Sequence, residues 1–320
     1  MKHHLLFAAS LFLTLPMLTA QVKPLKVFIL AGQSNMQGQA VVDLTGKDYN
    51  DGKGTLVMLY NDPVKAPIYK HLKTSDGKWA TRDDVWVQYQ RGDADLKAGL
   101  LGLGYSAYDD DHHFGMELQF GHVVGDGIKN QVLLIKTAWG GKSLDVDFRP
   151  PSSGGQVGPF YTKMISEIND ALKNLRTNFP KYDGRGYEIA GFVWWHGWND
   201  FCDKNMVPVY EQNLINLIHD VRKDLKSPKL PVVIGDITGG WMKDDQDIPE
   251  EALAIKKAQK NASLKPEFKG TVKTVETFDF VRKASDSPHP GHEHHEFGNA
   301  ETYFLVGDAL GKAMLSLMPK

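Results

Sequence analysis

Cysteine is almost absent from this 320-residue chain: Cys202 is the only one, so no disulfide can form within the chain. An excess of basic charge is also lacking, because 37 Lys and Arg side chains are balanced by 39 Asp and Glu, for a net charge of −2. Nucleic-acid binding needs a basic face, so nucleic acid is not an expected partner. With 42% hydrophobic residues, the composition is that of a globular protein with a large core.

Long hydrophobic runs are equally scarce, and the most continuous one lies at the N-terminus. A short basic start precedes a predominantly apolar segment from Leu5 to Leu18, and the small residue Ala20 follows. The segment is too short for a membrane-spanning helix and has the layout of a secretory signal peptide. We therefore expect a signal peptide over residues 1–20 with cleavage after Ala20, no membrane span, and a periplasmic or secreted mature chain.

The rest of the chain alternates between short apolar runs and amphipathic segments. Strand-like runs occur at residues 27–31, 132–136, 187–195, 230–236 and 272–277, and helical periodicity at 160–179, 209–225 and 299–315. A strand–helix–strand rhythm of this kind is typical of right-handed parallel crossovers. The sequence predicts an α/β fold: a three-layer α/β/α sandwich around a mainly parallel five-stranded sheet, of flavodoxin-like type, in a single domain over residues 21–320.

Residues 41–113 are polar and turn-rich and lack helical periodicity. We expect a long loop excursion from the sheet here, with short strands at 55–60 and 85–89. The acidic run from Asp109 to His113 has no known metal-ligand spacing, so a solvated loop is the preferred interpretation. Excursions at the carboxyl ends of strands commonly shape a substrate groove.

The first apolar run passes directly into Gly32-Gln33-Ser34-Asn35-Met36. These small and polar residues suit a tight turn with free backbone amides. Ser34 would then stand at the carboxyl end of a strand, where open α/β sheets bind their ligands. By itself, a turn of this kind does not indicate an active site. Because residues after later strands could supply an oxyanion site and a base, we consider Ser34 a candidate nucleophile.

Two further strand ends carry groups that could bind an oxyanion. Gly140 and Gly141 follow the second strand and would leave backbone amides exposed. Asn199 follows the third strand within His196-Gly197-Trp198-Asn199-Asp200 and offers a side-chain amide. The sequence does not decide which glycine donates; a family resemblance carried by these same residues implies that Asn199 or His196 is the second donor.

These blocks, in this order, resemble those of the SGNH hydrolases, over residues 27–314. The Gly32-Gln33-Ser34-Asn35-Met36 motif resembles in particular that of the sialate O-acetylesterase-like branch, carbohydrate esterase family six. The resemblance implies an SGNH-type domain in which Ser34 is the nucleophile, a glycine of the 140–141 pair and Asn199 hold the oxyanion, and no cofactor or metal takes part. It also implies an exported serine esterase that removes O-acetyl groups from carbohydrate, either sialic acid or an acetylated polysaccharide, through an acyl-enzyme.

A serine nucleophile needs a base, and histidine suits that role because its pKa lies near neutrality. Four histidines lie between the fifth strand and the closing helix. Asp286-Ser287-Pro288-His289-Pro290 fits the usual SGNH spacing, whereas His295 begins the branch's His-x-x-Gly-x-Ala-x-x-Tyr pattern. We favour His295 as the base. The alternatives are His289, His292 and His294.

The third member of the triad is open, because the residue three before His295 is His292 rather than an aspartate. Asp286 and Glu293 are candidate acids, or a backbone carbonyl could orient the ring. Two other functions compete: a carbohydrate-binding protein on an esterase-like scaffold with weak or no catalysis, and a hydrolase whose histidine cluster binds a metal. The oligomeric state is not predicted.

Overall fold

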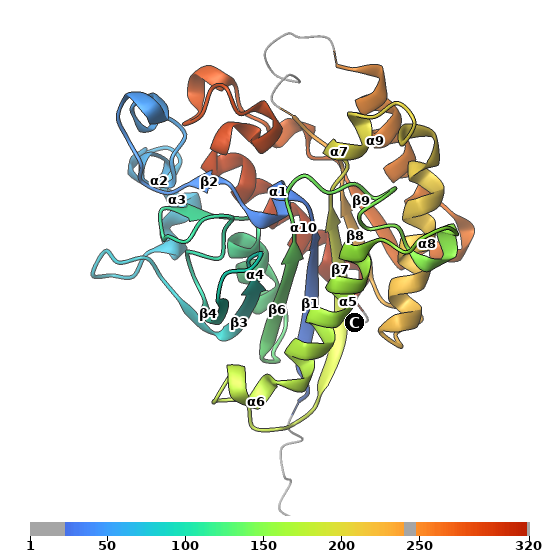
Figure 1. Ribbon diagram of the computed structural model, residues 1–320. Helices are drawn as coiled ribbons and strands as arrows, with labels where there is room; N and C mark the ends of the chain where they lie inside the picture. The colour runs from blue at the N-terminus through green and yellow to red at the C-terminus, as the bar shows by residue number, and fades with distance from the viewer. Residues whose placement is uncertain (1–22, 240–247, 319–320) are drawn as a thin grey trace, which may run out of the picture.

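The computed structural model describes residues 23–239 and 248–318, so the expected signal peptide lies outside the described residues. A seven-stranded sheet forms its centre, with the strand order β4-β3-β6-β1-β7-β8-β9 (Figure 1). All neighbouring strands are parallel except β3 and β4, which are antiparallel. The strands are β1 Leu25–Gly32, β3 Arg82–Gln90, β4 Leu96–Leu101, β6 Val132–Ala138, β7 Tyr187–Trp195, β8 Val232–Gly235 and β9 Val272–Val275.

Helices cover both faces of this sheet, and the alternation of side chains along β1 shows how. Val27 and Ile29 point into one core, with α5 (Pro159–Lys173), α8 (Tyr210–Asp224) and α9 (Glu250–Ser263). Phe28 and Leu30 point into the other, with α4 (Glu117–Gly127) and α10 (Ala300–Leu317). The predicted three-layer α/β/α arrangement is confirmed. Every one of these four side chains is fully buried, which stabilises the fold by about 1.5–3 kcal/mol per residue.

The predicted strand count of five was too low, because part of the 41–113 excursion returns to the sheet. β3 pairs in parallel with β6, and β4 then covers the edge. The strand expected at 55–60 is wrong: this segment is helix α2, Leu56–Asn61. The Thr55 hydroxyl accepts from the Met58 amide, so a helix N-cap replaces the apparent strand. The remaining excursion elements are β2 (Ala40–Val41), η1 (Lys47–Gly52), α3 (Ala66–Tyr69), η2 (Lys70–Leu72) and β5 (His113–Phe114).

The carboxyl ends of the central strands meet at one rim, at the top of Figure 1. β1 is followed there by α1 (Ser34–Gln37), β6 by the 139–149 loop, and β7 by α7 (Trp198–Phe201). The ends of β1 and β7 approach so closely that a Cβ on Gly32 would lie 2.1 Å from the Trp195 carbonyl oxygen. Only glycine fits at position 32, and the tight approach fixes the two loops against each other. The other short elements are α6 (Leu175–Asn178), η3 (Pro151–Ser153), η4 (Val207–Val209), η6 (Pro266–Phe268), η7 (Phe278–Phe280), η8 (Ala284–Asp286) and η9 (Glu293–Gly298).

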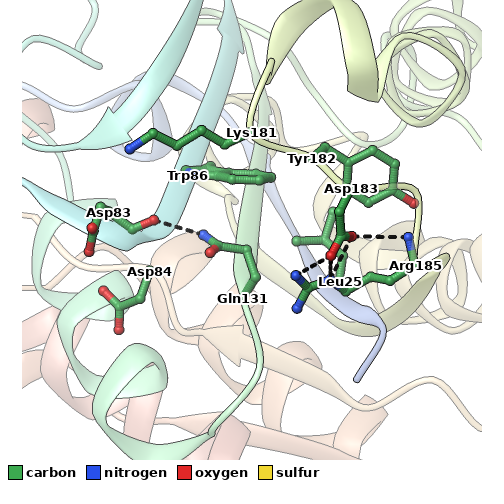
Figure 2. Close-up of a pocket in the computed structure, with 9 residues that line it drawn as sticks. All are labelled: Leu25, Asp83, Asp84, Trp86, Gln131, Lys181, Tyr182, Asp183 and Arg185. Atoms are coloured by element: carbon green, nitrogen blue, oxygen red, sulfur yellow. Dashed lines mark hydrogen bonds and ion pairs between the residues drawn. The ribbon is translucent and has the colours of Figure 1, made fainter. Parts of the chain in front are cut away.

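A cleft also opens at the opposite, amino-terminal end of the sheet (Figure 2). Its lining includes Leu25 at the start of β1, Trp86 on β3, and the ion pair between Asp183 and Arg185. It therefore lies at the far end of the strands from Ser34. No described helix is long and apolar enough to cross a membrane.

Candidate active site

Ser34 begins helix α1 immediately after β1, and its side chain is half-buried at the rim of the sheet. The preceding side chain, Gln33, is 3% exposed. Its Oε1 accepts from the backbone amides of Gly197 at 3.0 Å and Trp198 at 3.1 Å. A single buried carboxamide thus ties the turn that carries Ser34 to the turn that carries Asn199.

Gly140 is the glycine of the 140–141 pair that lies against Ser34. A Cβ built on Gly140 would lie 3.4 Å from the Ser34 Cβ, whereas one on Gly141 would meet nothing within 4 Å. The Gly140 amide donates to Gln37 Oε1 at 2.8 Å, and Gln37 Nε2 donates to the Tyr89 hydroxyl at 2.9 Å. An acceptor already sits on the Gly140 amide, at the place where an oxyanion would need a donor.

Asn199 lies half-buried on α7, and its neighbour Asp200 fixes that helix to the glycine loop. Both oxygens of the Asp200 carboxyl accept from Leu144 N, at 2.8 and 3.0 Å, and Oδ1 also accepts from Asp145 N at 3.0 Å. Burial raises the pKa of Asp200 to about 7, against the lowering effect of these backbone amides. The loops after β6 and β7 are thereby held in one arrangement.

His196 does not fit the role of second oxyanion donor. Its side chain is fully buried and stacks on Trp194, with ring centroids 4.6 Å apart. Its Nε2 donates to the Lys142 carbonyl at 2.8 Å, and its Nδ1 lies 3.3 Å from the Tyr210 hydroxyl. Burial lowers the pKa of His196 to about 3. Both ring nitrogens are occupied, so His196 packs the core behind the rim, and Asn199 is the remaining candidate for a side-chain donor.

The histidine loop reaches the same rim from the other end of the chain. The segment η9 contacts α1, and the Tyr303 hydroxyl joins the two. Tyr303 Oη donates to Asn35 Oδ1 at 2.7 Å and lies 3.3 Å from the His295 carbonyl oxygen. Trp198 also contacts the His294 ring, with centroids 5.9 Å apart. Within the described residues no hydrogen bond joins Ser34 Oγ to a histidine ring, a contact that often tightens only when substrate binds.

The four histidine rings form a continuous cluster rather than a carboxylate-oriented base. The rings of His294 and His295 lie 4.0 Å apart, and those of His289 and His292 lie 5.0 Å apart. Burial and the neighbouring rings lower the pKa of His295 to about 3 and that of His289 to about 4. His292 is exposed. The half-buried rings of His289 and His295 are therefore neutral at physiological pH.

Neither candidate acid bonds His295 among the described residues. Asp286 is exposed; its amide donates to the Lys283 carbonyl at 3.1 Å, and its carbonyl oxygen accepts from Asn299 Nδ2 at 3.2 Å. Glu293 is exposed as well; burial and the His292 ring lower the pKa of His294, and Glu293 only opposes that shift. No group of three or more His, Cys, Asp or Glu side chains in the described ranges is arranged to hold a metal ion.

Sequence reasoning missed Glu296, which directly follows His295. Its side chain is fully buried at a positive φ of 51°, and its Oε1 accepts from the Thr238 hydroxyl at 2.5 Å. Its Oε2 has no hydrogen-bond partner among residues 23–239 and 248–318, and burial raises the pKa of Glu296 to about 8. No pattern in the sequence marks an internal glutamate in a His-Glu-rich loop as buried. The other missed contributors, Gln33, Tyr303 and Asp200, act through hydrogen bonds across long sequence separations.

Comparisons with known proteins agree with this geometry. A family model described as carbohydrate esterase, sialic acid-specific acetylesterase, matches residues 24–316. A probable carbohydrate esterase from Arabidopsis thaliana is 24% identical over 250 residues, which cover 75% of this chain and 79% of the relative.

Three solved structures share the fold. An Arabidopsis thaliana protein superposes with a TM-score of 0.57 at 18% identity, covering 92% of this chain and 99% of its own. NanS gives 0.57 at 15% identity, with 91% and 97% covered. A carbohydrate acetylesterase from Xanthomonas citri gives 0.51 at 12% identity, with 90% and 56% covered.

Proposed function

The chain belongs to the carbohydrate esterase family of sialic acid-specific acetylesterases, and from that premise we propose that it is an exported serine esterase that removes O-acetyl groups from carbohydrate. One observation carries the proposal. The turns after β1, β6 and β7 are joined around Ser34 by the buried side chains of Gln33 and Asp200. Such preorganisation of a nucleophile and amide donors is what acyl transfer requires.

In the proposed reaction, Ser34 Oγ attacks the acetyl carbonyl carbon while His295 takes the hydroxyl proton. The resulting oxyanion accepts from the Gly140 amide, the Ser34 amide and Asn199 Nδ2. The C–O bond to the sugar then breaks, and the sugar oxygen leaves with the proton from His295. Water attacks the acetyl-Ser34 ester by the same route, which releases acetate and restores the serine.

Gln37 has a definite part in this scheme. Its Oε1 occupies the Gly140 amide in the free protein at 2.8 Å, so the side chain must swing away when the oxyanion forms. The Tyr89 hydroxyl, which accepts from Gln37 Nε2, provides the anchor about which it moves. Gln37 Oε1 therefore accepts the hydrogen bond of the Gly140 amide until the substrate oxyanion takes its place.

His295 is the preferred base because its backbone, held by Tyr303, shares a hydrogen-bonded group with Asn35, the neighbour of Ser34. Its lowered pKa keeps the ring neutral at physiological pH. We propose that this backbone anchoring takes the orienting role that an aspartate has in other triads, since neither Asp286 nor Glu293 bonds the ring.

Hydrolysis of 4-nitrophenyl acetate tests the assignment. Ser34→Ala and His295→Ala should each lower kcat by about 10³-fold or more. His289→Ala is the matched control, because His289 belongs to the same cluster but lies outside η9, the segment that contacts α1, and its ring meets Tyr49 with centroids 4.8 Å apart. If His289→Ala is inactive and His295→Ala active, the base assignment is wrong. If Ser34→Ala keeps wild-type activity, the proposed mechanism is wrong.

A carbohydrate-binding role with weak catalysis is the second candidate, and the absence of a carboxylate on His295 among the described residues favours it. A fluorophosphonate probe separates the two functions. An esterase forms a covalent adduct on its nucleophile, whereas a binding protein that has lost catalysis does not. Export rests on the signal-peptide pattern of residues 1–20, and the N-terminal residue of protein recovered from the periplasm or medium tests it.

A further inference from the structure

A buried ion pair lies next to the end of the helix that carries Ser34. Lys136 Nζ on β6 lies 2.7 Å from Glu117 Oε2 at the start of α4, and both side chains are fully buried. Lys136 is in register with Leu30 on β1 and with Tyr89 on β3. Its side chain therefore points to the face of the sheet that α4 covers.

Stability alone gives no reason for an ion pair at this position. Removing two charges from water carries a large desolvation penalty, and apolar residues of similar volume are often as stabilising. The pair does impose a defined geometry, because each charged group must keep its partners. Besides Glu117, Lys136 Nζ has the Tyr105 carbonyl as an acceptor. It also faces the Tyr89 ring, 5.1 Å from the centroid, so the pair fixes β6, β3 and the start of α4 relative to one another.

The first link from this pair to the nucleophile passes through Gly115. The second carboxylate oxygen, Glu117 Oε1, accepts from the Gly115 amide at 2.9 Å. A Cβ on Gly115 would lie 2.9 Å from Lys136 Nζ and 3.0 Å from the Cα of Gly38. A single backbone segment without a side chain thus separates the ion pair from Gly38.

Gly38 ends the helix that begins at Ser34. Its amide donates to the Ser34 carbonyl at 3.1 Å and to the Asn35 carbonyl at 3.2 Å. Its φ of 95° favours glycine, and a Cβ on Gly38 would lie 2.5 Å from the Cα of Gly115. Because the two backbones are already in close contact, a shift of Gly115 toward Gly38 must move the turn that carries the nucleophile.

A second link leads from the ion pair to the oxyanion site. The Tyr89 hydroxyl, on the ring that faces Lys136 Nζ, accepts from Gln37 Nε2 at 2.9 Å. Gln37 Oε1 in turn accepts from the Gly140 amide at 2.8 Å. The pair is thus connected both to the Ser34 turn and to the Gly140 amide, whose spacing governs acyl transfer.

We propose that Lys136 and Glu117 are positioning residues for acyl transfer, whose ion pair holds the Ser34 turn and the Gly140 amide at the spacing that the reaction needs. This inference rests on the proposed esterase function and adds to it two residues that touch neither substrate nor reacting atoms. A misplacement of about 1 Å can cost about 100-fold in rate. Loss of the pair should therefore lower kcat, whereas KM should change little, because fully buried side chains make no contact with substrate.

Two double variants separate positioning from stability. Glu117→Met/Lys136→Met buries no charge, so we expect a Tm within about 5 °C of wild type. Its kcat for 4-nitrophenyl acetate should fall about 100-fold, with KM changed by less than about twofold. Glu117→Gln/Lys136→Met keeps an oxygen that can accept from the Gly115 amide and should recover at least about tenfold of the lost kcat. Wild-type kcat in Glu117→Met/Lys136→Met, or equal kcat in the two double variants, would overturn the inference.

A third variant disturbs the same contact without removing either charge. Gly115→Ala places a Cβ against Lys136 Nζ and Gly38 and should lower kcat at least about tenfold. A wild-type kcat in Gly115→Ala would overturn the inference even if the double variants do not fold.

Arg222→Met is the matched control, because Arg222 is also a buried cation but donates to the Leu230 carbonyl, at the amino-terminal end of β8. It should lower the Tm and leave kcat, measured below that Tm, at the wild-type value. An equal loss of kcat in Arg222→Met would contradict a specific role for Lys136. If the wild type hydrolyses no acetyl ester, the proposed function and this inference fail together; an active wild type with an equally active Glu117→Met/Lys136→Met refutes the positioning role alone.

Discussion

The contact between Gln33 and the turn after β7 offers the sharpest test of how the oxyanion site is held. Gln33→Ala removes the Oε1 atom that accepts from the amides of Gly197 and Trp198, at 3.0 and 3.1 Å. Because Gln33 is almost fully buried, water cannot simply replace it. An unsatisfied buried amide costs about 1–2 kcal/mol, so the variant should lose about 3 kcal/mol of unfolding free energy, or about 6–12 °C in Tm.

The same substitution should affect catalysis more than stability, because Asn199 follows Trp198 on the turn that Gln33 holds. Misplacing one oxyanion donor costs about 10²–10³ in kcat. Gln33→Glu is the matched variant, since a carboxylate of the same shape still accepts from both amides. It should retain much more activity than Gln33→Ala.

Kinetics with 4-nitrophenyl acetate and thermal unfolding, measured on the same preparations below the Tm of the variant, provide the assay. If Gln33→Ala loses stability as expected but keeps kcat within about twofold of wild type, Gln33 is a packing residue only, and the reasoning about positioning is refuted.

Three further substitutions test other parts of the account. Gly32→Ala would place a Cβ 2.1 Å from the Trp195 carbonyl and should destabilise the protein by about 3 kcal/mol, seen as a lower urea midpoint; an unchanged midpoint would contradict the close approach of β1 and β7. The ordinary pKa of a glutamate, 4.5, is raised to about 8 in folded Glu296, so the unfolded chain loses this proton first and stability falls as pH rises from about 4.5 to 8. Glu296→Gln should flatten that part of the stability–pH curve, and an identical slope in both proteins would refute the buried neutral carboxyl. Glu117→Gln leaves fully buried Lys136 without its 2.7 Å partner and should cost about 3–5 kcal/mol, most of which Lys136→Met should recover in the double variant; additive losses would contradict the pairing.

The central sheet and the three strand ends that build the site could be predicted from the sequence. β1, β6 and β7 are nearly continuous apolar runs that end in glycine or polar residues, so the sequence predicts that Ser34, the Gly140–Gly141 pair and Asn199 each follow the end of a strand. Parallel topology supplies the rest, because the carboxyl ends of neighbouring parallel strands meet at the same edge.

What could not be predicted depends on tertiary contacts. The apolar residues of Leu56–Asn61 predict a strand, but the segment is a helix whose N-terminus is capped by the Thr55 side chain. The polar excursion adds β3 to the sheet because β6 offers an open edge, a fact that no local pattern in residues 82–90 contains.

The contacts of the site histidines also could not be predicted from local sequence. The family resemblance favours His295 as the base and offers His196 as a donor, but only the fold shows that Lys142 and Tyr210 occupy both nitrogens of His196. Likewise, the link from Tyr303 to Asn35 spans 268 residues and has no counterpart in local sequence.

Covalent labelling with a fluorophosphonate, followed by mass spectrometry of the proteolysed protein, tests the central claim most directly. The account predicts one adduct, on the peptide that contains Ser34, formed at least 100-fold more slowly in His295→Ala but at the wild-type rate in His219→Ala, a histidine on α8 that packs against Phe268. An enzyme that hydrolyses acetyl esters yet carries no adduct on Ser34, or carries it on another residue, would contradict the account.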